Sequence, residues 1–199
     1  MDATDPRPTS ANRILETALE LFSERGYDGT SVREICEAAH ITKPTLYYFY
    51  GNKDGVFRAL VLGALEEVRH EVELGLAASG PLVERLKLIT RGFFVRINAQ
   101  PKLWRFIQAS LWMPSLAQVD DMHHIYVDMC QRIASAMQQA EAAGELQPGP
   151  AATRMLVLTG GISEALCNFL IFGAPALTPE LADELIDCVV NGWLPRPTP

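Results

Sequence analysis

The chain has only four cysteines among its 199 residues, and no two of them are close in the sequence. Cys36, Cys130, Cys167 and Cys188 form no C-x-x-C pair, and each falls within a helical pattern. We therefore expect buried thiols that behave as small apolar side chains. A redox or thiol-sensing role is the alternative.

Membrane and export signals are also missing. No run of eighteen apolar residues occurs, so we expect no membrane-spanning helix. The first ten residues are acidic and rich in proline, unlike a signal peptide. These absences lead us to expect a cytoplasmic protein.

Catalytic motifs are absent as well. The sequence contains no G-x-S-x-G, H-E-x-x-H or Walker loop, so its scattered acidic, His and Ser residues form no recognisable active site. Asp120, His124 and Asp128 share one helix face at i, i+4 and i+8, but we expect that face to be solvated rather than metal-bound. We predict no enzymatic activity, no cofactor and no metal.

Positive charge is scarce. The net charge is −7, and even residues 1–53 hold more acidic than basic side chains. This balance argues against broad electrostatic binding of DNA. Any DNA binding must depend on a few well-placed cations, with weak non-specific affinity and a strong dependence on salt.

Helical periodicity, in contrast, runs through nearly the whole chain. Apolar residues recur at helical spacing, no segment alternates with period two, and 48% of the residues are hydrophobic, which is ample for a core. We predict an all-α protein of about nine helices. Their expected ranges are Ser10–Arg25, Ser31–Ala39, Thr42–Tyr50, Lys53–Ala78, Leu82–Ile97, Pro101–Trp112, Ser115–Ala143, 151–173 and Thr178–Trp193.

Residues 30–53 form a distinct unit of two short helices joined by a tight turn. Ser31 and Glu34 are spaced for a capping box at the start of the first helix. Thr42 is suited to the N-cap of the second helix, and Pro44 lies in its first turn, where no N–H is needed.

The second helix of this unit is unusual for a core helix. It begins with Lys43 and Thr45 and continues with the aromatic run Tyr47–Tyr50, which has too many rings for one small core. Hydroxyls and a cation at a helix N-terminus, followed by phenols, suit a helix whose tip enters the major groove of DNA.

This unit resembles the helix-turn-helix of the TetR family of transcriptional regulators, over about the first third of the chain. The matching residues are Gly26-Tyr27, Thr30–Ile35, Thr45–Tyr48 and Lys53-Asp54. Three positions depart from the family pattern. His40 lies in the turn where Gly is usual, Phe49 stands where His is frequent, and Tyr50 replaces Phe.

We assign residues 8–68 to a TetR-type helix-turn-helix head, with its motif at residues 31–50, and residues 69–199 to an effector-binding and dimerisation body. The residues expected at the DNA are Thr30, Ser31, Arg33, Thr42, Lys43, Pro44, Thr45, Tyr47, Tyr48 and Lys53. Lys43 and Thr45 should read base edges, whereas Thr30, Tyr47, Tyr48 and Lys53 should hold phosphates.

The middle of the chain is rich in aromatic residues on helices that are broken by proline. Such helices pack imperfectly, and apolar cavities with a few polar groups bind small molecules. We expect a pocket lined by Phe93, Phe94, Ile97, Trp104, Ile107, Trp112, Met113, His123 and Tyr126. Plain core packing is the alternative for most of them. His123 lies on the inward stripe of its helix, either in the pocket or as a hydrogen-bonded core histidine.

The last two helices are more apolar than one chain can cover. Residues 151–173 are apolar almost all round, and Gly160 and Gly161 would allow a second helix to approach closely. We predict a two-fold, four-helix dimer interface, with an intrachain core helix as the alternative. Its expected residues are Met155, Leu158, Ile162, Leu166, Phe169, Leu185, Val189 and Trp193.

These features predict a ligand-responsive transcriptional regulator whose partner is double-stranded operator DNA. We expect a homodimeric repressor that binds a near-palindromic operator and is released by a small, largely apolar effector, as the TetR resemblance also implies. The alternative is a DNA-binding regulator without a small ligand, controlled by a partner protein or by thiol oxidation. The sequence identifies neither the effector nor the operator, and it does not separate a repressor from an activator.

Overall fold

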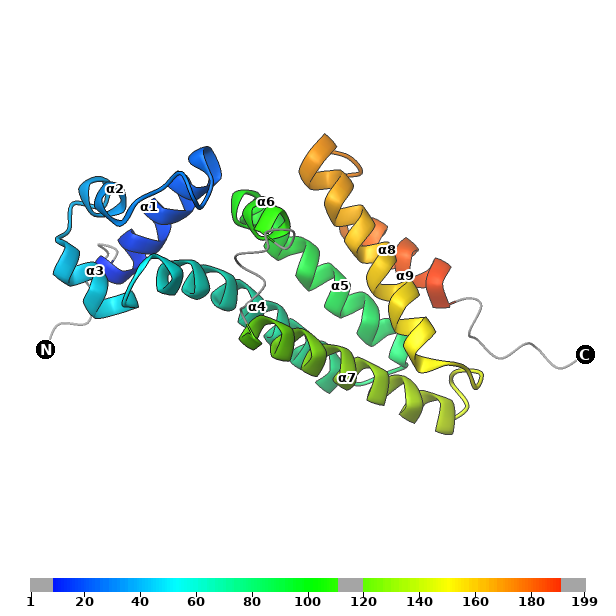
Figure 1. Cartoon of the computed structure of the whole chain (residues 1–199). Coiled ribbons are helices and arrows are strands. Elements are labelled where there is room, and N and C mark those ends of the chain that lie inside the picture. Colours follow the sequence, from blue (N-terminus) through cyan, green and yellow to red (C-terminus); the bar gives the residue numbers. More distant parts are fainter. Residues whose placement is uncertain (1–8, 111–119, 191–199) are drawn as a thin grey trace, which may run out of the picture.

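The computed structural model describes residues 9–110 and 120–190, and every regular element in these ranges is a helix. The nine helices found there confirm the predicted all-α fold (Figure 1). They are α1 (Ser10–Arg25), α2 (Val32–Ala38), α3 (Lys43–Tyr50), α4 (Lys53–Ala77), α5 (Leu82–Ala99), α6 (Pro101–Ser110), α7 (Asp120–Ala142), α8 (Ala151–Phe172) and α9 (Pro179–Val190). The predicted helix limits at Trp112, Ser115 and Trp193 lie outside the described residues.

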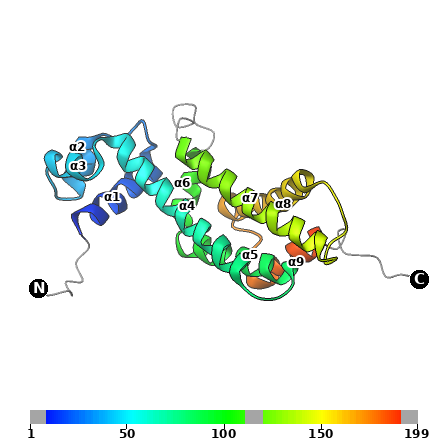
Figure 2. The same ribbon diagram turned by 90° about the horizontal axis from the view of Figure 1, so that it is seen from below.

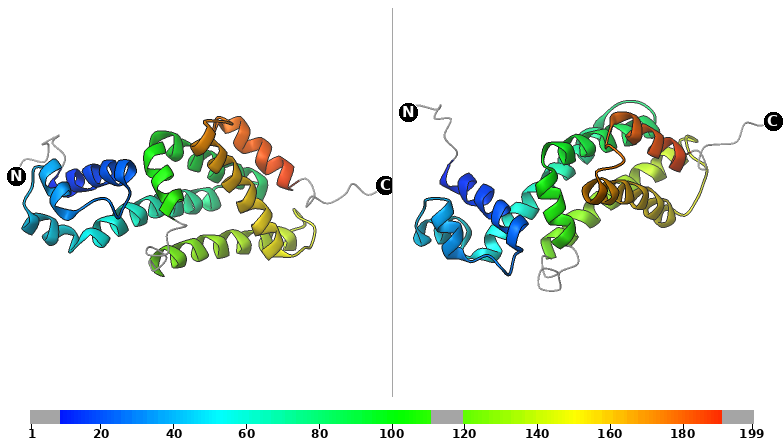
Figure 3. Two further views of the ribbon diagram at one scale, coloured as in Figure 1. Left: turned by 45° about the horizontal axis from the view of Figure 1, so that its top comes forward. Right: turned by 90° about the horizontal axis from the view of Figure 1, so that it is seen from above.

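Helix α4 connects the two parts of the molecule. Its 25 residues span about 38 Å at 1.5 Å per residue. Figure 1 shows α1–α3 gathered at its N-terminal end and α5 and α7 along its C-terminal half. Figures 2 and 3 show α6 standing between α1 and the rest of the body, so α4 is not the only bridge to the head.

Most helix boundaries follow local signals in the sequence. Ser31 and Glu34 form the predicted capping box, in which the Glu34 carboxylate accepts from the Ser31 N–H at 2.8 Å. Thr42 caps α3 as predicted. The first helix begins at Ser10, as in the predicted range, and its N-cap is Thr9, whose hydroxyl oxygen accepts from the N–H of Asn12 at 3.3 Å.

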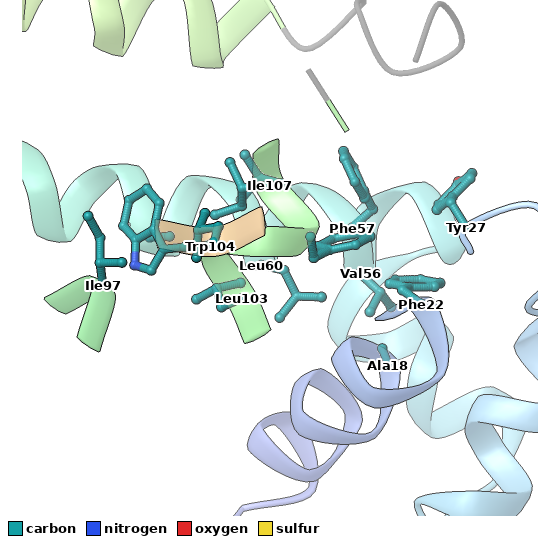
Figure 4. Packing of buried hydrophobic residues seen from close by; sticks show 14 of the residues in the cluster. Ala18, Phe22, Tyr27, Val56, Phe57, Leu60, Ile97, Leu103, Trp104 and Ile107 are labelled. Carbon is teal, nitrogen blue, oxygen red and sulfur yellow. The ribbon is translucent and has the colours of Figure 1, made fainter. Parts of the chain in front are cut away.

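One apolar cluster runs without a break from the head into the body. Phe106 of α6 stacks on Phe22 of α1, with ring centroids 5.5 Å apart and planes inclined by 15°. Phe106 also meets the ring of Phe57 on α4 at 5.5 Å, edge to face, and Phe57 contacts Tyr27 at 5.4 Å. Figure 4 shows side chains from α1, α4 and α6 converging in this cluster. The head and the body therefore share a core.

A second apolar cluster fills the end of the body remote from the head. Its large members come from α4, α5, α7, α8 and α9. They include Val72, Leu82, Leu86, Ile89, Met129, Ile133, Met137, Met155, Leu158 and Ile186. Because methionine is unbranched and flexible, this part of the core can adapt its shape more readily than the aromatic first cluster.

Helix α8 is the one helix in the described part of the chain that is long and apolar enough, by length and composition, to cross a membrane. Its most apolar window has a mean hydropathy of 1.7, although no unbroken apolar run of eighteen residues exists. A core helix of a soluble protein meets the same criteria. Met155, Leu158 and Leu166 on one face of α8 are indeed buried against other helices of the body.

The turn between α2 and α3 contains a residue in the left-handed region that is not glycine. His40 has a φ of 51°, and it is the one non-glycine residue with positive φ in the described ranges. This conformation costs an L-residue about 1–2 kcal/mol. The sequence indicated this cost, because His40 stands where the family usually has glycine.

Replacing His40 with Gly should therefore raise the free energy of unfolding by about 1 kcal/mol, since glycine adopts positive φ without a Cβ clash. Urea unfolding followed by circular dichroism would measure the difference. His40→Ala is the matched control, because it removes the imidazole and keeps the strain. Equal stability of the Gly and Ala variants would contradict a strained turn.

Candidate nucleic-acid interface

Helix α3 is held to the head by one fully buried side chain and leaves the rest of its surface open. Leu46 has no exposed area, whereas Tyr48 is 83% exposed and Tyr47 and Phe49 are close to half exposed. Tyr50 turns inward, and its hydroxyl donates to a main-chain carbonyl of α1 at 3.1 Å. Burial raises the pKa of Tyr50. Three of the four rings therefore point away from the core, as expected for a helix that meets a partner.

The first turn of α3 presents hydroxyl groups and a cation to solvent. Thr42 Oγ1 accepts from the N–H of Thr45 at 3.4 Å and lies 2.9 Å from Thr45 Oγ1. Lys43 and Pro44 in the same turn are exposed. Because a helix N-terminus also carries a positive partial charge and free N–H groups, this turn is suited to phosphate and to base edges.

The start of α2 is partly used within the head. Ser31 Oγ donates to the Glu34 carboxylate at 2.7 Å, and these capping bonds are the main cause of the lowered pKa of Glu34. Arg25 pairs with the same carboxylate at 3.1 Å. Arg33 lies 3.5 Å from Glu37, and both side chains are well exposed. An exposed pair of this kind contributes at most about 1 kcal/mol, so Arg33 can exchange Glu37 for a phosphate.

Thr30 and Lys53, two expected phosphate contacts, are engaged in the turn between α1 and α2. Thr30 is buried, and its hydroxyl donates to the carbonyl oxygen of Gly26 at 3.0 Å. Lys53 Nζ donates to the carbonyl oxygens of Tyr27 at 2.8 Å and Thr30 at 3.0 Å, and it lies 4.1 Å from the centre of the Tyr27 ring. Lys53 thus ties the start of α4 to the α1–α2 turn in the free protein, and the phosphate contacts expected of Thr30 and Lys53 stay predictions.

Most of the predicted pocket residues are packed core side chains. Those buried in the first cluster are Phe94, Ile97, Trp104 and Ile107. Figure 4 shows Ile97, Trp104 and Ile107 there, and Phe93 meets the edge of Trp104 at 5.2 Å. Trp112 and Met113 lie outside the described residues. Two surface clefts of the body, one at the α4–α5–α7 junction and one at the α7–α8 loop, are lined by other residues.

The expectation that His123 faces inward is wrong, because its side chain is exposed. The inward stripe of α7 is formed instead by Met122, Ile125, Met129 and Ile133. Tyr126, also expected in the pocket, lies half exposed on the flank of α7 and bonds to Cys130 and to Thr159 of α8. Partial burial is the main cause of its raised pKa. Tyr126 therefore joins α7 to α8.

The stripe of α8 and α9 that was predicted for a dimer packs within the chain. Met155, Leu158 and Leu166 are buried, whereas Ile162, Phe169, Leu185 and Val189 are partly buried against the two clusters. Trp193 lies outside the described residues. This corrects the prediction for Met155, Leu158 and Leu166, because periodicity cannot tell which face of α8 meets the same chain, whereas the partly buried residues stay predicted interface residues.

The opposite face of α8 carries the exposed apolar side chains. We call it the outer stripe, and it consists of Leu156, Val157, Gly160, Ile171 and Phe172. Leu156 and Phe172 are 72% and 74% exposed. The sequence contained one signal for this stripe, since residues such as Leu156 and Phe172 make the helix apolar almost all round.

Comparisons with known proteins agree with this geometry. The family profile of bacterial regulatory proteins, tetR family, matches residues 14–60, which hold most of α1, all of α2 and α3, and the start of α4. UidR, an HTH-type transcriptional regulator from Escherichia coli (strain K12), is 26% identical over 165 residues, which cover 80% of this chain and 82% of UidR.

Two further proteins resemble this chain, one in sequence over 50 residues and one in structure over most of its length. IcaR, the HTH-type negative transcriptional regulator of the biofilm operon icaADBC in Staphylococcus epidermidis, is 44% identical over 50 residues, 25% of this chain and 27% of IcaR. FadR from Bacillus subtilis, solved in complex with stearoyl-CoA, has a TM-score of 0.77 and 19% identity over 90% of this chain and 97% of that one.

The capped helix pair, the outward-facing α3 and the nine-helix architecture thus agree with these matches along both the head and the body. The chain belongs to the tetR family of helix-turn-helix transcriptional regulators, which bind DNA, and it is not an enzyme.

Proposed function

We propose that this regulator is a cytoplasmic repressor that binds a near-palindromic operator as a homodimer and leaves it when a small, largely apolar effector binds. Residues 8–68 form its DNA-binding head, and residues 69–199 form its effector-binding and dimerisation body. The observation that carries the proposal is α3, which is anchored by Leu46 and faces outward with its N-terminal turn and three aromatic rings.

Contacts to DNA come mainly from α3. Lys43 and Thr45 read base edges in the major groove, and Tyr47 and Tyr48 hold phosphates through their hydroxyls. Lys53 acts indirectly, because its two hydrogen bonds to the α1–α2 turn fix the position from which α2 and α3 start. The net charge of −7 makes the rest of the surface unattractive to DNA, so these few residues must supply the affinity.

A second copy of the chain covers the outer stripe of α8. In the monomer, exposed leucine, isoleucine and phenylalanine side chains on one face of α8 leave apolar area in contact with water. Removing this area from water in a dimer is favourable by about 25 cal/mol per Å². Gly160 has no heavy atom of another residue within 4 Å of the position of a Cβ, so a partner helix can approach closely there. A two-fold pairing through α8 therefore supports reading of a near-palindrome.

The effector acts on the apolar interior of the body. The second cluster, with Met129, Met137 and Met155, can change shape to admit an apolar molecule. The relative from Bacillus subtilis was solved with stearoyl-CoA, whose acyl chain is apolar, and this supports an effector with an apolar chain. IcaR, named a negative regulator, supports repression rather than activation.

The signal from body to head passes through α6 as well as through a tilt of α4. Arg105 Nε donates to the carbonyl oxygen of Leu170 on α8 at 3.0 Å, and Gln108 Nε2 donates to Cys167 Sγ of α8 at 2.9 Å. Phe106, between them, lies in the aromatic cluster of the head. Any shift of α8 or of the body core therefore displaces α6 and, with it, α1.

The energy required for release is small. Two recognition helices must lie about 34–36 Å apart to enter successive major grooves of a two-fold operator. An effector that binds a form with a different spacing of these helices more tightly, by about 1.4 kcal/mol, lowers operator affinity tenfold. Operator DNA must then lower effector affinity by the same factor.

The cysteine in the head, Cys36, argues against control by thiol oxidation. Cys36 is buried beneath the helix pair, and this burial raises the pKa of its thiol. Since the thiolate is the reactive form, Cys36 is a poor sensor at neutral pH.

Lys43→Ala should change the preferred base at one or two operator positions, at a cost of about 1–3 kcal/mol there. Lys53→Ala should weaken binding to all sites alike and lower the melting temperature, because the α1–α2 turn loses two hydrogen bonds. Selection from random DNA, fluorescence anisotropy and thermal unfolding would measure these effects. A selection that enriches no sequence would rule out operator binding, and an unchanged melting temperature of Lys53→Ala would contradict the role given to that lysine.

Leu156→Arg should convert the dimer to a monomer and abolish high-affinity operator binding, because it places a charge at the outer stripe. Leu74→Arg is the matched control, since Leu74 is also an exposed leucine, at 54% on α4 against 72% for Leu156 on α8. Light scattering at micromolar concentration would report the mass of each variant. A monomeric wild type, or the same loss in Leu74→Arg, would contradict a dimer through α8.

Phe106→Ala should lower the free energy of unfolding by about 3–5 kcal/mol and loosen the head more than the far end of the body. Amide hydrogen exchange would show faster exchange in α1–α3 and little change around the second cluster. Phe93→Ala, which removes a ring that meets Trp104 in the body, is the control. Uniform loosening in both variants would contradict the link through α6.

A further inference from the structure

A polar cleft lies at the end of α4 that is remote from the head. It has a volume of about 370 Å³ and is formed where the C-terminal part of α4 meets α5 and α7. Figure 2 shows these three helices running together on the side of the body away from the DNA-binding head. The side chains that bear on its chemistry are Leu76, Arg85, Gln131, Arg132, Ser135 and Gln139.

Helix α7 contributes a row of hydrogen-bonding side chains to this cleft. Gln131, Ser135 and Gln139 are spaced i, i+4 and i+8, so they share one face of the helix and offer amide and hydroxyl donors along it. Arg132 is held beside them by Asp128, whose carboxylate accepts from Arg132 Nε at 2.7 Å. The cleft therefore combines neutral donors with a fixed guanidinium.

Arg85 supplies a second guanidinium from α5. Its Nη1 donates to the carbonyl oxygen of Leu76 at the end of α4, at 3.2 Å. Its Nε is buried and has no hydrogen-bond partner in the described part of the chain. A guanidinium pairs with an oxyanion through two adjacent N–H groups, and the bond from Nη1 leaves the edge formed by Nε and Nη2 for such a partner.

Charge supports an anionic partner over a cationic one. The lining contains two arginines and one carboxylate, that of Asp128, which Arg132 already neutralises. Glu73 of α4 lies 3.8 Å from Arg132 Nη1, but it is paired more closely with Arg69 at 2.6 Å. Two guanidinium groups and one carboxylate leave the lining with one net positive charge, in a chain whose net charge is −7.

We infer that this cleft binds a small organic anion through a carboxylate or a phosphate group. Arg85 lines the cleft from α5 and offers the edge of its guanidinium that Leu76 does not use, and Arg132 lines the cleft from α7. Gln131, Ser135 and Gln139 donate to the remaining oxygens. The cleft borders the second apolar cluster, since Ala136 belongs to that cluster and Leu76 packs against it, but its polar lining suits a ligand other than the apolar effector. The anion is therefore a second ligand.

The position of the cleft gives the anion a route to the rest of the molecule. Arg85 holds the last turn of α4 through Leu76, and the anion joins Arg85 to α7. Occupancy therefore fixes α4 relative to α7 at the end opposite the DNA-binding head. This inference does not depend on the proposed effector or on the operator, because binding can be measured on the free protein.

The test is a titration of the full chain, without DNA, with inorganic phosphate and separately with succinate. Ionic strength is held constant with sodium chloride, and binding is followed by calorimetry and by the melting temperature. We expect saturable binding of at least one anion, with a rise of about 3–6 °C in melting temperature at ten times its Kd. Saturation by phosphate alone or by succinate alone identifies the group that the cleft prefers.

Three variants locate the site. Arg85→Met and Arg132→Met remove a guanidinium while keeping an unbranched side chain, and each should weaken binding at least tenfold. Arg91→Met is the matched control on α5, because Arg91 is paired with Asp183 of α9 outside the cleft. Ser135→Phe fills the cleft without changing charge and should also abolish binding, which keeps the test valid if Arg85→Met does not fold.

Two results would overturn the inference. One is the absence of saturable binding of both anions to the wild type. The other is an equal loss of affinity in Arg91→Met and in the cleft variants, which would show that the anions respond to net charge and not to this site.

Discussion

The packing of Phe106 against Phe22 and Phe57 is the contact on which the arrangement of the molecule depends. It places a ring of the body inside the core of the DNA-binding head, so the head shares its core with the body. A rigid aromatic contact of this kind transmits displacement, because a close-packed interior cannot absorb it by local compression. The polar bonds from α6 to α8 extend the same connection to the surface proposed for the dimer.

The head shows how an acidic protein can be arranged to bind an acidic polymer. Its binding surface is the part of α3 that remains exposed, because Leu46 is fully buried and Tyr50 turns inward to bond to α1. Lys53, in contrast, donates its hydrogen bonds to main-chain carbonyls of the α1–α2 turn. Affinity then depends on the position of a few residues and not on the total charge.

The body has three regions of different chemical character. Its interior is apolar and rich in methionine, which suits an effector that enters by displacing side chains. The outer stripe of α8 is apolar and exposed, whereas the cleft at the end of α4 is polar and carries two guanidinium groups. A dimer partner, an apolar effector and an anion would therefore each meet a region of different chemical character, although the cleft borders the apolar interior at Leu76 and Ala136.

Local sequence was enough to predict the helices, the caps of α2 and α3 and the helix-turn-helix, because these depend on residues within one or two turns of each other. Ser31 with Glu34 and Thr42 with Thr45 are examples. It also determined that α8 has more apolar surface than one chain needs. Tertiary structure decided which face of α8 is buried, that His123 is exposed, and that Lys53 bonds to carbonyls 23 and 26 residues away. The physical reason is that helical periodicity gives the direction of a side chain around its own axis, whereas its partner is set by the packing of other helices against that axis.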